Sequence, residues 1–126
     1  MKFIPIFLLL LLLAGCAVKP KQATYRQVTM EVAITMMAEK EGYIILDVRR
    51  ADEYASGHIP GAINVANESI GTAKIPELPD KDQLILVYCR SGNRSKQAAQ
   101  KLVDLGYTNV VEFGGIMDWP GETTTP

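Results

Sequence analysis

Apolar residues follow two different spacings along the chain, and the two spacings alternate. Short continuous apolar runs are typical of buried strands, and apolar residues at i, i+3 and i+4 are typical of amphipathic helices. The runs predict five strands, at residues 25–28, 43–48, 63–66, 83–88 and 109–113. The helical spacing predicts helices at 29–41, 50–55 and 95–105, with short ones between 67 and 82 and through Trp119. The alternation predicts an α/β fold whose mainly parallel sheet is covered on both faces.

The run at 83–88 is the most apolar of the five, which predicts that its strand lies at the centre of the sheet. In open parallel sheets, ligands bind beyond the carboxyl ends of the strands. Cys89 follows this strand directly. The sequence therefore predicts a thiol at the end of the sheet where ligands bind.

The first sixteen residues have the pattern of an export signal. Met1-Lys2 is a short cationic start, residues 3–13 are apolar, and Leu13-Ala14-Gly15-Cys16 follows. The apolar run is shorter than the roughly 20 residues that a membrane span needs, and it has the length of the core of a secretory signal. A buried or anchoring N-terminal helix is the alternative interpretation.

Leu-Ala-Gly-Cys resembles the lipobox of bacterial lipoproteins. The resemblance implies cleavage before Cys16, lipidation of its thiol and acylation of the new N-terminus, and several acyl chains together give stable membrane anchoring. Ala17 follows Cys16, where an aspartate commonly retains lipoproteins at the inner membrane. In a two-membrane bacterium this favours the periplasmic face of the outer membrane, and in a one-membrane bacterium the outer face of the cytoplasmic membrane.

We expect four parts along the chain: a signal peptide at 1–15, a lipidated N-terminus and tether at 16–24, one domain at 25–120 and a flexible tail at 121–126. The 111 residues from Cys16 onward are enough for one small domain with a single core. The formal net charge is −1, without a basic stripe, which argues against nucleic acid as a partner. We expect a monomer.

The chain has two cysteines, and an exported protein can pair such residues in a disulfide. A thioether at Cys16 cannot pair, so a Cys16–Cys89 disulfide is an alternative only where lipidation fails. Cys89 is then a free thiol in a compartment that oxidises thiols. Such a thiol needs a functional reason.

The loop after Cys89 has the composition of an anion site. A glycine-containing turn at a helix start brings together backbone N–H groups without a partner inside the helix, and these favour anions, including the reactive thiolate. Gly92 allows a positive φ, Ser91 and Ser95 supply hydroxyl groups, and Arg90 and Arg94 supply charged donors. We expect Cys89 as the nucleophile and Arg90, Ser91, Gly92, Asn93, Arg94 and Ser95 as the loop that binds a small sulfur-containing anion.

The loop Cys89-Arg90-Ser91-Gly92-Asn93-Arg94-Ser95 resembles the active-site loop of the rhodanese family. Further agreement lies in Leu46-Asp47-Val48-Arg49, in residues 53–64, in Leu105-Gly106-Tyr107 and in Phe113-Gly114-Gly115 with Trp119. The resemblance covers residues 25–120 and implies a three-layer α/β/α fold and a sulfurtransferase. It implies that Cys89 takes the outer sulfur of thiosulfate, releases sulfite, and carries the sulfur as a persulfide until a thiol or cyanide removes it. It implies neither a metal nor an organic cofactor.

The supporting residues have more than one interpretation. Asp47 and Arg49 match the family's Asp-Val-Arg motif and either form an ion pair at the strand end or contact substrate. His58, the only histidine, lies in a Gly-His-Ile-Pro-Gly turn, for which the resemblance implies a structural hydrogen bond rather than a general base. Glu53 is expected to be structural, paired with an arginine. One histidine and one free cysteine are too few for a zinc site.

Two other functions remain open at this point. Protein-tyrosine phosphatases place an arginine six residues after the cysteine, where this chain has Ser95, whereas Arg94 is five residues after Cys89. The shorter loop fits a sulfur-sized centre better than a phosphoryl group. A tethered module that binds a persulfide or an oxyanion without turnover is the alternative from another functional class.

Overall fold

Five parallel strands form the centre of the molecule, in the spatial order β1-β5-β4-β2-β3. Their bounds are Arg26–Gln27 (β1), Ile44–Asp47 (β2), Ile63–Asn64 (β3), Ile85–Cys89 (β4) and Val110–Gly115 (β5). The computed structural model describes residues 24–126, so the predicted signal peptide and Cys16 lie outside the described residues. The predicted parallel sheet is confirmed. The strand that ends at Cys89, β4, is the central one, with two strands on each side of it.

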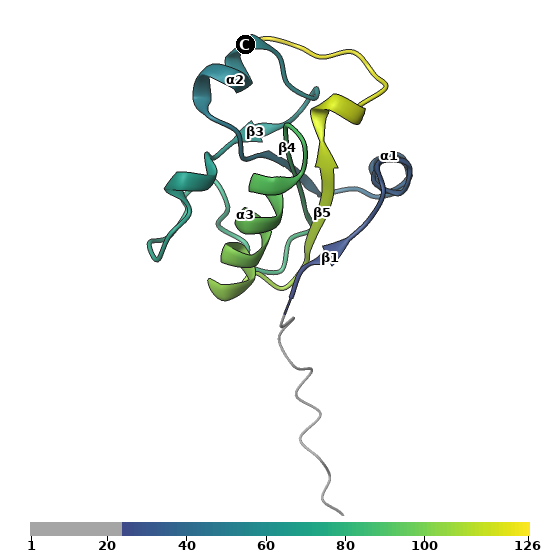
Figure 1. Ribbon diagram of the computed structural model, residues 1–126. Coiled ribbons are helices and arrows are strands. Elements are labelled where there is room, and N and C mark those ends of the chain that lie inside the picture. Colours follow the sequence, from purple (N-terminus) through teal and green to yellow (C-terminus); the bar gives the residue numbers. More distant parts are fainter. Residues whose placement is uncertain (1–23) are drawn as a thin grey trace, which may run out of the picture.

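Residues 24–126 contain three helices, two of which pack on the sheet, and two 3-10 turns. They are α1 (Met30–Glu39), α2 (Ala51–Ser56) and α3 (Asn93–Asp104), with η1 (Asn67–Ser69) and η2 (Ile116–Asp118). Figure 1 shows α1 and α3 on opposite sides of the strands, as expected for a three-layer arrangement. Within residues 24–126, every helix is too short or too polar to cross a bilayer.

The N-terminal end of α1 follows directly from its sequence. Thr29 caps the helix, because its Oγ1 accepts the N–H of Val32 at 3.2 Å. The helix ends at Glu39, two residues before the predicted end, since Lys40 is already extended (φ −107°, ψ 154°).

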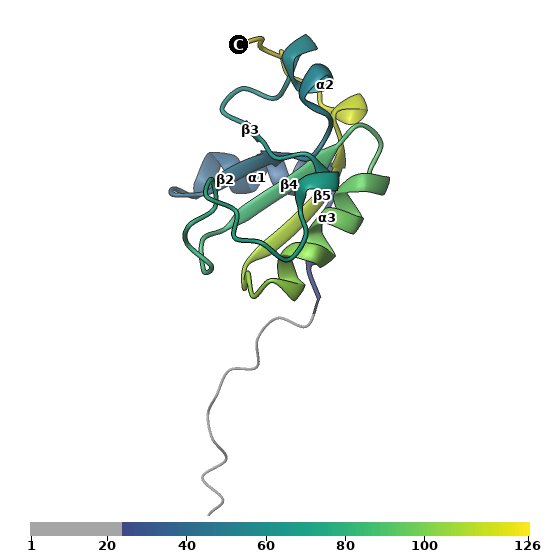
Figure 2. The same cartoon turned by 90° about the vertical axis from the view of Figure 1, so that its left-hand side faces the viewer.

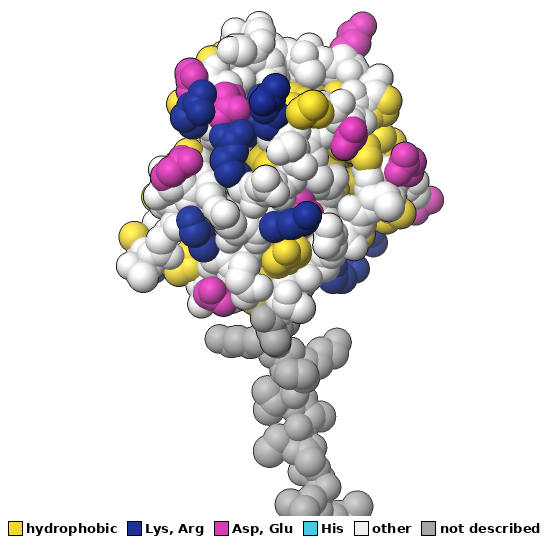
Figure 3. All heavy atoms as spheres, viewed as in Figure 1, with side chains coloured by type: hydrophobic (Ala, Val, Ile, Leu, Met, Phe, Trp, Pro, Cys, Tyr) yellow, Lys and Arg dark blue, Asp and Glu magenta, His cyan; other side chains and the backbone are white. Residues whose placement is uncertain are grey.

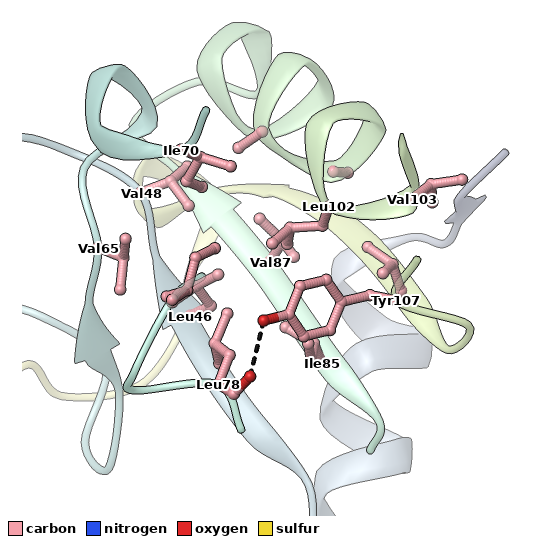
Figure 4. Packing of buried hydrophobic residues seen from close by; sticks show 14 of the residues in the cluster. Leu46, Val48, Val65, Ile70, Leu78, Ile85, Val87, Leu102, Val103 and Tyr107 are labelled. Carbon is pink, nitrogen blue, oxygen red and sulfur yellow. Dashed lines mark hydrogen bonds between the residues drawn. The ribbon is translucent and has the colours of Figure 1, made fainter. Parts of the chain in front are cut away.

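Each face of the sheet has its own apolar cluster, because side chains along a strand alternate between the two faces. Ile85, Val87 and Cys89 of β4 face the cluster that α3 covers, whereas Leu86 and Tyr88 face the cluster that α1 covers. Figure 4 shows the packing on the α3 side. On that side the Tyr107 hydroxyl donates to the Leu78 carbonyl at 2.7 Å, which fastens the proline-containing loop over the sheet (Figure 4).

The C-terminal segment differs from the expected flexible tail in one respect. Thr124 forms an isolated antiparallel bridge with His58, in which each N–H donates to the other residue's carbonyl at 2.9 Å. Figures 1 and 2 both show the C-terminal end beside α2. Two backbone hydrogen bonds hold this exposed segment in place. Residues 121–126 have no apolar pattern from which these bonds could be predicted.

Candidate active site

Cys89 is the last residue of the central strand, and its side chain faces α3. The residue is only 1% exposed. Its Sγ accepts the N–H of Gly92 at 3.0 Å and lies 3.3 Å from the Ser95 Oγ. A main-chain N–H directed at the sulfur stabilises negative charge there, as an anion site at a helix start requires.

The chain turns from β4 into α3 at Gly92. The φ of Gly92 is 108°, in the left-handed region that favours glycine. This conformation lets the helix begin at Asn93, two residues earlier than the predicted start at Ser95. Asn93, Arg94 and Ser95 therefore form the first helical turn, whose N–H groups have no acceptor within the helix. The predicted loop is thus half turn and half helix start.

The end of β5 packs directly against the backbone of this loop. A Cβ added at Gly115 would lie 1.9 Å from the carbonyl oxygen of Arg90, so the two backbones are in direct contact and only glycine fits. The N–H of Met117 donates to the same Arg90 oxygen at 3.2 Å. The Gly114-Gly115 pair therefore sets the position of the Cys89 loop.

The two arginines of the loop have different surroundings. Arg94 donates from both terminal nitrogens to the carboxylate of Glu53 on α2, with Nη2 3.0 Å from Oε2. Arg90 is exposed, and within residues 24–126 its guanidinium has neither a hydrogen bond nor an ion pair. Arg94 is therefore fixed in place, and Arg90 is free to bind an anion.

The ion pair changes the acid–base properties of both partners. The hydrogen bonds from Arg94 lower the pKa of Glu53 from 4.5 to about 2. The hydrogen bonds to Glu53 raise the pKa of Arg94, and the nearby Cys89 adds a smaller charge effect in the same direction. Figure 3 shows basic side chains gathered around acidic ones over α2 and the start of α3. The positive charge beside Cys89 is thus permanent.

Asp47 and Arg49 form a buried ion pair at the end of β2. Arg49 Nη2 donates to Asp47 Oδ2 at 2.7 Å, and the Tyr88 hydroxyl donates to the same oxygen at 2.7 Å. Burial opposes the charge of Arg49, but the hydrogen bonds and charge of Asp47 outweigh it and raise the Arg49 pKa. Burial, reinforced by Asp47, also raises the pKa of Tyr88. Of the two open interpretations, the geometry matches the ion pair.

This network positions the turn that holds His58. Arg49 Nη2 also donates to the Gly57 carbonyl at 2.7 Å, and the Tyr88 hydroxyl accepts the Ile59 N–H at 3.1 Å. His58 is buried, stacks on the Tyr54 ring at 3.7 Å, and places Nδ1 2.9 Å from the Tyr54 carbonyl oxygen. No hydrogen bond joins it to Cys89 in the described part of the chain, so the geometry matches the structural role.

Sequence reasoning missed one residue of this site, Glu112 on β5. Its side chain is fully buried, and its Oε2 lies 2.6 Å from Ser95 Oγ and accepts the Gly114 N–H at 2.7 Å. The available signal was a single acidic residue within the apolar run at 109–113. A charge in a strand of this kind is buried only with a partner.

Proteins of known activity and known structure are similar to this chain. The profile of the family described as rhodanese-like domain matches residues 29–122. The thiosulfate sulfurtransferase GlpE of Pseudomonas entomophila is 38% identical over 104 residues, which cover 79% of this chain and 92% of the relative. The thiosulfate sulfurtransferase PspE of Escherichia coli is 37% identical over 73 residues, covering 58% of this chain and 70% of the relative.

Two solved structures share the fold. The rhodanese-like domain of the Anabaena protein Alr3790 aligns with a TM-score of 0.72 at 27% identity, over 82% of this chain and 81% of that one. An Escherichia coli rhodanese solved with anions aligns with a TM-score of 0.61 at 32% identity, over 67% of this chain and 99% of that one.

Proposed function

The chain belongs to the rhodanese-like family, and on that premise we propose that it is a sulfurtransferase that uses Cys89 as its sulfur carrier. The donor is thiosulfate or a related sulfur-containing anion, and the acceptor is a thiol or cyanide. The proposal rests on one observation above all: the Cys89 sulfur accepts the Gly92 N–H at 3.0 Å at the start of α3. A sulfur in that position is stabilised as the thiolate, which is the nucleophilic form.

The reaction has two displacement steps. The Cys89 thiolate attacks the outer sulfur of thiosulfate and forms a sulfur–sulfur bond. The original sulfur–sulfur bond of thiosulfate breaks, and sulfite leaves with the electron pair. A thiolate or cyanide then attacks the terminal sulfur of the persulfide. The bond to Cys89 breaks and the thiolate is regenerated, so the cycle needs no external oxidant or reductant.

The loop supplies the charge that this cycle requires. The first-turn N–H groups of α3 and the guanidinium of Arg90 bind the sulfonate oxygens of the donor, and they then stabilise the charge of the persulfide. Arg94 stays hydrogen-bonded to Glu53 and contributes the electrostatic field of its positive charge. Arg94 is five residues after Cys89. This spacing suits a sulfur-sized centre better than a phosphoryl group.

The test is a thiosulfate and cyanide assay on the full chain with Cys16→Ser, so that Cys89 is the only thiol. We expect thiocyanate from this protein and none after a further Cys89→Ser substitution. A persulfide mass adduct without turnover would instead support the binding module. Hydrolysis of an aryl phosphate faster than sulfur transfer would support a phosphatase.

We also propose that the domain is anchored to a membrane by lipid on Cys16, outside the cytoplasm. The proposal is supported by the cationic start, the apolar run at 3–13 and the Leu-Ala-Gly-Cys sequence. Ala17 favours the periplasmic face of the outer membrane where a bacterium has one. Cys16→Ala should release the protein from membranes in a fractionated cell, and unchanged retention would contradict the proposal.

A further inference from the structure

Glu112 is a fully buried carboxylate beside the reactive cysteine. It lies between Val111 and Phe113, both of which belong to the apolar cluster on the opposite face of the sheet. Its Oε2 accepts the Gly114 N–H, whereas its Oε1 is buried without a hydrogen-bond partner in residues 24–126. Half of this carboxylate is therefore unsatisfied, which is costly for a group that only caps a backbone N–H.

The register of the sheet brings Glu112 to this position, just before an irregularity in β5. Val87 pairs with Glu112 and Cys89 pairs with Gly115, so β5 contains one more residue than β4 between the two pairs. Paired residues of neighbouring strands project to the same face. Glu112 therefore projects toward α3, as Val87 and Cys89 do.

Ser95 joins the two groups. Its Oγ lies 3.3 Å from Cys89 Sγ and 2.6 Å from Glu112 Oε2. The Gly92 and Gly114 carbonyl oxygens lie within reach of the same hydroxyl, at 3.0 and 3.3 Å, but the carboxylate is the nearest acceptor and the only charged one. Since a serine has one hydroxyl hydrogen, a Ser95 that donates to Glu112 leaves its own lone pairs directed at the thiol.

We infer that Glu112 accepts the proton of Cys89 through Ser95 when the thiolate forms. The S–H bond of Cys89 breaks and its proton goes to Ser95 Oγ, while the hydroxyl hydrogen of Ser95 passes to Glu112 Oε2. The products are a thiolate, an intact serine that donates to it, and a neutral carboxylic acid. The net charge of the buried site stays at −1 throughout. The inference rests on the proposed sulfurtransferase and gives its buried thiol an internal proton acceptor.

Burial gives this relay its function. Cys89 is 1% exposed, so water has little access to its proton. Five charged groups surround the relay. Arg94 on α3 is paired with Glu53 on α2, and Arg90 is adjacent to Cys89. Lys96 and Asp118 line the same hollow as Glu112. The raised pKa of Arg94 and the lowered pKa of Glu53 keep that pair ionised across neutral pH.

The relay predicts a specific pH dependence. With an internal acceptor, the fraction of Cys89 present as thiolate does not change with pH while the pair shares one proton, which gives a plateau in reactivity. Without that acceptor, each thiolate costs one proton released to solvent, and reactivity rises about tenfold per pH unit below the midpoint. Glu112→Gln keeps an oxygen for the Gly114 N–H and removes only the proton acceptor.

The experiment uses the full chain with Cys16→Ser and follows two reactions of Cys89 against pH: sulfite release from thiosulfate in a single turnover, and alkylation by iodoacetamide. We expect a plateau around neutral pH in this protein and in the surface control Glu39→Gln. We expect a one-proton slope in Glu112→Gln and in Ser95→Ala. Thermal unfolding of each variant checks that it is folded.

Three outcomes would overturn the relay: the same pH profile with and without Glu112, a pH-independent loss of rate in Glu112→Gln, or a Cys89 that neither reagent modifies at any pH. The alkylation arm separates the relay from the proposed function. A plateau in alkylation that Glu112→Gln removes, without any sulfite release, would retain the relay and reject the sulfurtransferase.

Discussion

Arg94 and Glu53 are 41 residues apart in the sequence, and their side chains form two parallel hydrogen bonds. One residue belongs to the first turn of α3 and the other to α2. The pair therefore connects the loop that carries Cys89 to a helix from a different part of the chain. Its geometry separates the roles of the two loop arginines, which the sequence left open.

Arg94→Ala should lower the free energy of unfolding by about 1–3 kcal/mol, because it leaves the partly buried Glu53 carboxylate without its charged donors. Chemical denaturation measures this change. A double-mutant cycle with Glu53→Ala should recover most of it as a coupling between the two side chains. Additive single substitutions would contradict the pairing.

Arg90→Ala should weaken thiosulfate binding and leave stability unchanged. The free guanidinium makes charge-assisted contacts worth about 1.5–3 kcal/mol, so KM should rise about 10- to 100-fold while kcat changes little. Steady-state kinetics with thiosulfate and cyanide measure both constants. Lys40→Ala is the matched control. It also removes one positive charge, but at a position far from the Cys89 loop in the sequence, so KM should stay unchanged. An equal effect of the two substitutions on KM would indicate only long-range electrostatic attraction between the protein and thiosulfate, and would contradict a direct contact from Arg90.

The acid side of the stability curve should depend on Glu53. Its pKa is about 2 in the folded protein and 4.5 ordinarily, so the ionised form stabilises the fold fully above pH 4.5 and loses that effect as the pH falls toward 2. A shift of this size corresponds to about 3 kcal/mol, which partial exposure reduces to about 2 kcal/mol. Glu53→Gln should lower stability at neutral pH and flatten its decline below pH 4.5. Denaturant unfolding at several pH values measures this slope, and an unchanged slope would contradict the assignment.

Asp47→Asn should be strongly destabilising, because it leaves Arg49 as a buried charge without its counter-ion. Removal of one partner of a buried ion pair costs about 3–5 kcal/mol. Tyr88→Phe removes a single hydrogen bond to the same carboxylate and should cost about 1 kcal/mol. Thermal and chemical unfolding rank the two variants. An Asp47→Asn protein of normal stability that fails to bind thiosulfate would restore the substrate-contact interpretation.

Gly115→Ala should displace the Cys89 loop, since the new Cβ would meet the Arg90 backbone at 1.9 Å. We expect loss of most sulfurtransferase activity together with destabilisation of about 1–3 kcal/mol. Gly71→Ala is the matched control, because a Cβ at Gly71 has no atom within 4 Å. Retained activity in Gly115→Ala would show that the loop tolerates a shift of its support.

Most of the architecture could be predicted from local patterns. Apolar runs located the strands, Thr29 located the start of α1, and the most apolar run became the central strand. The apolar spacing predicts a start of α3 two residues too late, because the left-handed Gly92 lets the chain enter the helix before that spacing begins. A glycine in the sequence indicates that a turn is possible, but it does not indicate at which residue the next helix begins.

The identity of distant partners could not be predicted, although the sequence predicts that Glu53 pairs with an arginine. The partner of Arg94 lies 41 residues away, and nothing in the spacing of either residue identifies the other. Glu112 lies 17 residues from Ser95 and reaches it because the register of β5 places Glu112 opposite Val87, on the face that α3 covers. Such pairings depend on strand register, which a single sequence leaves undetermined.

The two outermost strands, β1 and β3, contain only two residues each. Long open edges expose rows of unpaired backbone groups on which a second chain can polymerise, and very short edge strands limit this hazard. A protein crowded on a surface meets its own copies at high local density. The brevity of these edges gives neighbouring copies little template for strand addition.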